Sequence, residues 1–137
     1  MLDNKGERTI QRPVIAFGER FCGTLEFSAD ALIRAKERGV VVWGITDTSQ
    51  TAIEPQTDLV RRLEAAGIPM ETQKHQDGIM HMKAVVTDSQ YAIGSYNWTS
   101  AATNLNDEVL EVGHDEAVRQ QYQNILEEVL QKYQGNQ

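Results

Sequence analysis

The chain has 137 residues, of which 40% are hydrophobic and 24% are charged, a balance typical of one globular domain with its own core. Its formal net charge of -7 and its pI near 4.9 exclude the overall excess of Lys and Arg that favours nucleic acid or membrane surfaces. Any polyanion must therefore be held by a local group of cations. The single cysteine, Cys22, excludes an internal disulfide and a cysteine zinc site.

The sequence does not predict insertion into a membrane. Residues 1–13 lack the apolar core of a signal peptide, and no apolar run approaches the roughly 20 residues needed to cross a bilayer. We expect one domain over 1–137, with 1–13 as a flexible N-terminus. These features favour a soluble, cytoplasmic protein without stable membrane insertion, although they do not identify its compartment.

The first part of the chain predicts a strand, a helix and a second strand. Residues 14–17 (VIAF) are typical of a short buried strand. Ser28 is placed to cap a helix over 29–38, which Gly39 would end. Residues 40–46 (VVVWGIT) are almost continuously apolar, as expected for a strand covered on both faces of a parallel or mixed sheet.

A second helix and a hairpin follow. Thr57 or Asp58 is placed to cap a helix with apolar residues at helical spacing, which Gly67 would stop. Residues 83–88 (KAVVTD) and 91–95 (YAIGS) then predict two strands joined by a tight hairpin connection.

The last part of the chain predicts a strand over 108–112 and a long helix capped by Asp115. This alternation of helices and strands indicates an α/β domain with a mixed sheet. The apolar face of the last helix would consist of Val118, Tyr122, Ile125, Leu126, Val129, Leu130 and Tyr133.

His81 and Lys83 carry the first part of a reactive pattern. Side chains two apart in a strand share a face, so these two would project together, while Asp88 has the opposite parity. An imidazole beside an ammonium suits attack on an anionic phosphorus centre, because the ammonium neutralises charge on the phosphate oxygens. Asp88 is then better placed to close the strand or the hairpin by hydrogen bonding.

Neutral hydrogen-bonding residues carry the second part. Ser95 and Asn97 share parity, and Gly94 leaves room for close approach to the backbone. No charged residue occurs over 89–106, which suits neutral donors directed at one anion. Glu108 ends that stretch, and a carboxylate there could orient a histidine and stabilise its protonated form.

In this order the residues resemble the HKD signature of the phospholipase D superfamily. The likeness covers roughly residues 28 to 133 and is greatest to small single-motif members, which include bacterial endonucleases and the mitochondrial cardiolipin hydrolase and piRNA-nuclease group. The matching residues are His81-Met82-Lys83, Asp88, Gly94-Ser95-Tyr96-Asn97 and Asn106-Asp107-Glu108.

The resemblance implies a phospholipase D-like mixed sheet flanked by helices and a metal-independent, two-step hydrolysis of phosphodiesters through a phosphohistidine. His81 would be the nucleophile, Glu108 would orient it, and Asp88 would be a motif residue of structural importance. The phosphate would be bound by Lys83, Ser95 and Asn97.

The implied mechanism needs a second histidine as general acid, and the chain contains one HxK only. Neither His75 nor His114 is followed by Lys two residues later, so we expect the second histidine to come from another copy in a two-fold homodimer. The N-terminus departs from the family pattern, because residues 10–27 offer one clear strand where small members carry a helix and a strand. We therefore expect a shorter N-terminal part of the fold.

Each residue also has an ordinary explanation when it is considered alone. His81 by itself would more often be a satisfied core or surface histidine, and Lys83 a solvated strand residue. A metal site of His75, His81, His114 and Asp77 matches no familiar ligand spacing, and Lys83 would repel a cation. Trp43 and Trp98 are possible base-stacking residues, but packing within the fold is the stronger expectation.

Three functions remain open from the sequence. The first is a nuclease acting on DNA or RNA, in which Lys74, Lys83 and Arg61 or Arg62 would supply cations locally. The second is the same chemistry on cardiolipin or another phospholipid, although no basic amphipathic helix is evident. The third is a catalytically inactive phosphate-binding or dimerisation module.

Overall fold

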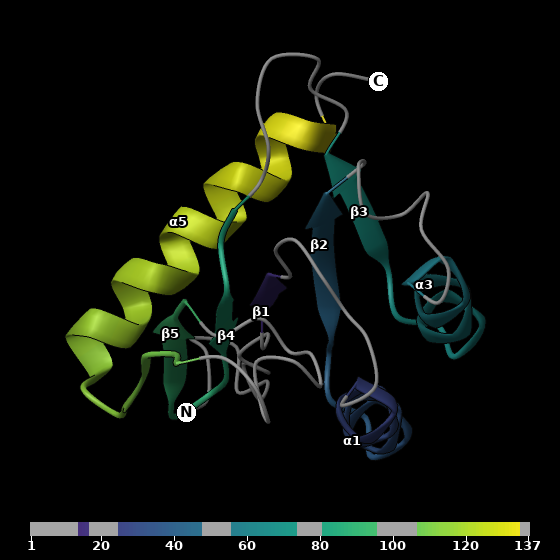
Figure 1. Cartoon of the computed structure of the whole chain (residues 1–137), viewed down its shortest axis with the longest axis horizontal. Helices are drawn as coiled ribbons and strands as arrows, with labels where there is room; N and C mark the ends of the chain where they lie inside the picture. The colour runs from purple at the N-terminus through teal and green to yellow at the C-terminus, as the bar shows by residue number, and fades with distance from the viewer. Residues whose placement is uncertain (1–13, 17–24, 48–55, 74–80, 96–106, 135–137) are drawn as a thin grey trace, which may run out of the picture.

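A mixed sheet between two helical layers forms the part of the chain that the structure describes (Figure 1). The computed structural model describes residues 14–16, 25–47, 56–73, 81–95 and 107–134. Its elements, in chain order, are β1 (Val14–Ala16), α1 (Leu25–Glu37), β2 (Trp43–Asp47), α3 (Gln56–Ala65), β3 (Met70–Gln73), β4 (Ala84–Val86), β5 (Tyr91–Gly94), β6 (Leu110–Gly113) and α5 (Glu116–Gln134).

The sheet has six strands in the order β3-β2-β1-β4-β5-β6. Strand β2 is parallel to both β1 and β3, whereas β4 is antiparallel to β1 and to β5, and β6 is antiparallel to β5. This arrangement confirms the mixed α/β fold that the sequence predicted. Because β4 runs in the opposite direction to β1 and β2, it begins at the end of the sheet where the carboxyl end of β2 lies.

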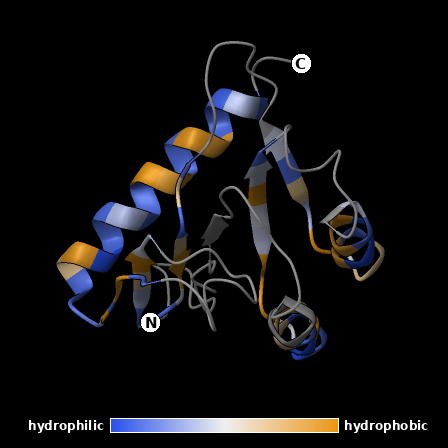
Figure 2. Cartoon of the chain, viewed as in Figure 1, coloured by the Kyte–Doolittle hydropathy of each residue, from blue (hydrophilic) through white to orange (hydrophobic). Residues whose placement is uncertain are grey.

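Alternating side chains of the strands divide the core between the two faces. Trp43 and Ile45 of β2 belong to a cluster that packs against α5, whereas Val42 and Val85 belong to a cluster with α1 and α3. Along α5, apolar residues alternate with polar ones, as Figure 2 shows. Trp43 is therefore a core residue, as expected. Ile125, which the sequence assigned to the apolar face of α5, is instead 47% exposed.

The ends of the two shorter helices follow the glycines that the sequence singled out. Gly39 and Gly67 have φ angles of 86° and 79°, in the left-handed region that glycine adopts at low cost. In each case the glycine N–H and the next N–H donate back to carbonyl groups of the last turn, for example Gly39 to Lys36 at 2.9 Å and Val40 to Ala35 at 3.1 Å. Both predicted helix ends are confirmed.

The predicted starts of α1 and α3 and some strand limits are wrong. Helix α1 begins at Leu25, so Ser28 lies inside it, and α3 begins at Gln56, so Thr57 and Asp58 lie in its first turn. Strand β6 begins at Leu110, two residues later than predicted. Strand β3 was not predicted, because Pro69 and the polar sequence METQ gave no clear strand signal.

Helix α5 begins where the sequence placed its cap. The Asp115 carboxylate accepts a hydrogen bond from Val118 N–H at 2.9 Å, which satisfies one of the free donors of the first turn. Among the helices that the structure describes, none combines the length and the apolar character needed to cross a bilayer.

One buried cation joins α5 to the β4–β5 hairpin. The Arg119 side chain is 1% exposed and donates to Thr87 O at 3.2 Å, to Gln123 Oε1 at 2.7 Å and to both carboxylate oxygens of Glu116 at 2.7 and 2.9 Å. The hydrogen bonds to Glu116, together with the nearby charge of Asp88, raise the pKa of Arg119. The same interaction lowers the pKa of Glu116, so this contribution to stability is lost as the pH falls through that pKa.

We expect Arg119→Ala to lower the free energy of unfolding by about 1–3 kcal/mol, because it removes a hydrogen-bond donor from the partly buried Thr87 carbonyl. Lys132→Ala, an equal loss of charge on an exposed part of α5, should change it by less than about 0.5 kcal/mol. Urea denaturation of both variants measures the difference. Equal effects of the two substitutions would show that Arg119 does not anchor the hairpin.

Candidate active site

The candidate site lies at the end of the sheet where strand β4 begins. The hydrogen bond from Gly94 N–H to Lys83 O, at 3.3 Å, extends the β4–β5 ladder one residue beyond the strand limits. Lys83 therefore has the parity of Val85, whose side chain packs in the core beneath α1 and α3. The Lys83 side chain thus belongs to the α1–α3 side of the sheet.

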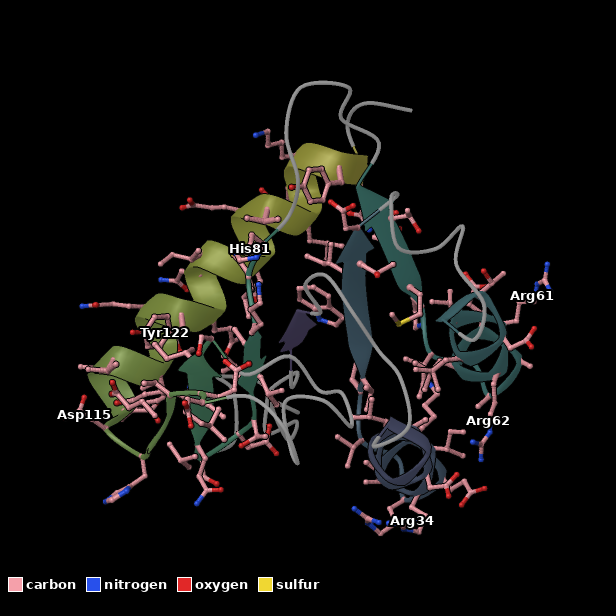
Figure 3. All side chains as sticks on the ribbon, viewed as in Figure 1. Arg34, Arg61, Arg62, His81, Asp115 and Tyr122 are labelled. Atoms are coloured by element: carbon pink, nitrogen blue, oxygen red, sulfur yellow. The ribbon has the colours of Figure 1, made fainter. Side chains whose placement is uncertain are left out.

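Lys83 is a buried cation. It is 6% exposed, and its Nζ donates to the backbone carbonyl of His81 at 3.0 Å. Because an ammonium is costly to remove from water, it requires hydrogen bonds and favours a nearby anion. The bond to the His81 carbonyl also fixes the backbone of the residue that the sequence named as the nucleophile. His81 itself is exposed and lies in the segment that leads into β4, as Figure 3 shows.

Gly94 allows the close approach of a neighbouring backbone segment, whereas the approach of a ligand to this residue stays a prediction. A Cβ atom at this position would lie 2.0 Å from Val109 O and 2.9 Å from Val109 C, so the close approach of β5 to the segment before β6 depends on the absence of a side chain. When the β4–β5 pairing is continued by one residue, Gly94 lies directly opposite Lys83. It therefore adds no side chain on the side of the sheet where the ammonium lies.

Ser95 and Glu108 form a second pair. The Ser95 hydroxyl donates to Glu108 Oε2 at 2.5 Å and accepts from Val109 N–H at 3.1 Å, while Ser95 N–H donates to Val109 O at 3.0 Å. The hydroxyl has one proton, so Ser95 must turn that proton away from Glu108 before it can donate to a phosphate oxygen. The predicted orientation of His81 by Glu108 stays a prediction.

Asp88 lies at the opposite end of β4 from Lys83, in the turn between β4 and β5. Thr87 supplies the hydrogen bonds of this turn: its N–H donates to Gln90 O at 2.8 Å, and its hydroxyl accepts from Gln90 N–H at 3.0 Å. Asp88 is exposed and acts on Arg119 through its charge. The hairpin prediction is confirmed, and the position of Asp88 favours a structural role.

Several predicted residues cannot be compared with the structure. Asn97, Trp98, His75 and Lys74 lie outside the described residues, as does Asp77. Over the ranges that are described, no three His, Cys, Asp or Glu side chains are grouped as metal ligands would be.

Two buried polar residues at the same end of the sheet were not identified from the sequence as candidate site residues. Thr46 and Asp47 end β2, are 1% and 2% exposed, and lie at the edge where β4 begins. The charge of Asp47 contributes, after burial, to the raised pKa of Tyr133 on α5. Their position directly after an apolar run was an available signal, because polar residues at the carboxyl ends of parallel strands often line functional sites.

Comparisons with known proteins agree with the family that the motif resembles. A family model described as "Cardiolipin synthase, PLD-like domain" matches residues 10–130. The mitochondrial cardiolipin hydrolase of Xenopus tropicalis is 30% identical over 130 residues, which are 94% of this chain and 58% of that protein. The chain therefore spans little more than half the length of this relative.

Solved structures agree with the fold. A phospholipase D family member, Nuc from Salmonella typhimurium, matches with a TM-score of 0.76 at 21% identity and covers 88% of this chain and 78% of that one. NucT from Helicobacter pylori matches with a TM-score of 0.71 at 22% identity and covers 88% and 79%. At this level of identity the matches concern the fold alone.

We expect Gly94→Ala to destabilise the protein by at least about 1–3 kcal/mol, because the added Cβ meets backbone atoms that cannot move aside independently. Gly39→Ala, which adds a methyl group in open space but at a positive φ, should cost only about 1–2 kcal/mol. Urea denaturation measures both. A Gly94→Ala variant as stable as the wild type would contradict the close approach to Val109.

Proposed function

This chain belongs to the phospholipase D superfamily, and we propose that it is a metal-independent phosphodiesterase, specifically an endonuclease that hydrolyses DNA or RNA as a homodimer. The observation that carries the proposal is the pairing of a buried ammonium with an accessible imidazole two residues away, at one edge of the sheet. Such a pair can bind the anionic phosphate of a diester and attack its phosphorus atom.

In the proposed reaction a nitrogen of His81 forms a bond to phosphorus and displaces one ester oxygen. A second histidine, from another copy of the chain, gives that oxygen a proton as it leaves. The same histidine then takes a proton from water, which attacks the phosphohistidine and releases His81. Lys83 neutralises charge on the non-bridging oxygens through both steps.

Ser95 and Glu108 fit a supporting role in this scheme. Their hydrogen bond holds the hydroxyl in place beside the segment that enters β6. When a phosphate binds, its oxygens can compete with Glu108 for the Ser95 proton. That exchange would leave the Glu108 carboxylate able to accept a hydrogen bond from an imidazole, the function proposed for it. Asn97 would add a further donor to the phosphate.

An exposed apolar segment supports the homodimer. Val109 and Val112 are 71% and 60% exposed, and Leu110 between them is 41% exposed. Large apolar side chains on an edge strand favour association in water. Leu110 pairs with Gly94, which faces Lys83, so the segment begins at the same end of the sheet as the candidate site. A two-fold interface there would bring two sites towards each other.

Hydrolysis of cardiolipin or another phospholipid is the second candidate, favoured by the 30% identity to a mitochondrial cardiolipin hydrolase. The reaction at phosphorus is the same, so the two candidates differ only in what surrounds the phosphate. We place the nuclease first because the small single-motif proteins that the signature resembles include bacterial endonucleases. A catalytically inactive phosphate-binding module is the third candidate.

We expect the wild type to hydrolyse bis(p-nitrophenyl) phosphate in excess EDTA and His81→Ala to be slower by about a thousandfold or more, because the nucleophile is lost. His114→Ala, which removes an exposed histidine outside the motif, is the matched control and should keep its activity. The release of p-nitrophenolate measures all three. No turnover by a folded, dimeric wild type would favour the inactive module.

We expect Val109→Lys combined with Val112→Lys to convert the dimer to a monomer, because two exposed apolar side chains would be replaced by like charges across the two-fold axis. Ile125→Lys alters an exposed apolar residue on α5 and should leave the dimer intact. Sedimentation velocity distinguishes these states. Dissociation caused by Ile125→Lys alone would place the interface on α5 and refute association through the edge strand.

A further inference from the structure

Charged residues are divided unevenly between the two helical sides of the sheet. Residues 25–39 and 56–67, which contain α1 and α3, carry five cations and five carboxylates. Residues 107–134, which contain β6 and α5, carry seven carboxylates and two cations, a net charge of -5. The first group of cations consists of Arg34, Lys36, Arg38, Arg61 and Arg62.

The burial of Arg119 increases this difference at the surface. Arg119 is directed into the fold and bound to Glu116, so it presents little charge to a ligand outside. Lys132 is then the exposed cation that remains over residues 107–134. A polyanion crossing α5 would meet a surface dominated by carboxylates, and such a surface repels it.

The arginines on the other side are accessible. Arg34, Arg61 and Arg62 point outward from α1 and α3, on the side of the molecule away from α5 (Figure 3). Arg61 Nη1 lies 3.4 Å from Asp58 Oδ1, and both side chains are 70% exposed. Arg62 forms a partly exposed ion pair with Asp30. Exposed ion pairs contribute little to stability, so a phosphate can replace these carboxylates at small cost.

The candidate site also belongs to this side. Lys83 has the parity of Val85, which packs beneath α1 and α3, so the sheet separates the reactive ammonium from α5. A diester bound by Lys83 would then have α1 and α3, and not α5, on the side of the sheet where the ammonium lies.

We propose that a polynucleotide whose scissile phosphate lies at His81 and Lys83 continues across α1 and α3, where Arg34 and Arg61 bind phosphates several nucleotides away, and does not cross α5. This inference rests on the proposed function and specifies the side on which a long substrate is bound. A small diester cannot reach the arginines, whereas a strand of roughly 10 or more nucleotides, within the range that single-stranded sites cover, can do so.

Matched charge reversals test this path. Arg34→Glu and Arg61→Glu each change the charge by the same amount as Lys132→Glu on α5. Binding of a fluorescent oligonucleotide of roughly 30 nucleotides, in deoxy and ribo forms, is measured in the His81→Ala background, so that no cleavage occurs. Hydrolysis of the same oligonucleotide and of bis(p-nitrophenyl) phosphate is measured in the otherwise wild-type protein.

We expect each arginine reversal to weaken oligonucleotide binding about tenfold at low salt and to reduce the slope of log K against log salt by about 0.7 for each phosphate that is no longer neutralised. Lys132→Glu should change binding less than about twofold, because α5 lies outside the path. The arginine reversals should also lower cleavage of the oligonucleotide about tenfold more than hydrolysis of the small diester. Glu64→Lys on α3 should strengthen binding, and Glu128→Lys on α5 should not.

Equal effects of the arginine and Lys132 reversals would overturn the path, as would arginine reversals without effect. Binding to vesicles of anionic phospholipid, with no binding to either oligonucleotide, would also overturn it and favour a lipid surface. Failure of the wild type to hydrolyse the small diester would count against the proposed enzyme but not against the path, because the binding measurement does not depend on turnover.

Discussion

Burial of the Lys83 ammonium is the constraint that the surrounding structure satisfies. A charged group that is 6% exposed has lost most of its hydration, a cost of several kcal/mol unless polar partners replace the water. The carbonyl of His81 is one such partner, which couples the position of the histidine to the charge of the lysine. The reversal of direction between β1 and β4 places this cation at the end of the sheet where β2 finishes.

Local signals in the sequence were sufficient to predict the helix limits that depend on the backbone conformation or capping of a single residue. Gly39 and Gly67 end their helices because a positive φ is cheap only for glycine, and Asp115 begins α5 because its carboxylate binds the free N–H of Val118. The hairpin was predictable because the connection between two short apolar runs is too short to join the two strands in any other way. The order of the motif residues identified the family, since few folds require a histidine, a lysine and a glycine-serine pair at these intervals.

Features that depend on the packing of distant segments were not predictable in the same way. Arg119 resembles any solvated residue of an amphipathic helix, and its burial follows from the hairpin that packs against it. Strand β3 has a polar sequence, and it is a strand because β2 offers a parallel partner. Ile125 has helical spacing with the core residues, but it is 47% exposed and lies outside the part of α5 that the core covers. In each case the tertiary environment outweighed the local pattern.

The spacing between Lys83 and Asp88 in the sequence corresponds to a length of strand in the structure. Lys83 lies at one end of β4 and Asp88 in the turn at the other. The spacing therefore includes the distance from the reactive end of the sheet to Thr87, where Arg119 attaches the hairpin to α5, which is about 13 Å for four residues at 3.3 Å per residue. Removing or adding one residue would alter that length and also move the lysine to the other face of the sheet. The spacing of the motif thus reflects the dimensions of a scaffold as much as the chemistry of a site, and a loss of activity after substitution of Asp88 can arise without any contact between this residue and the substrate.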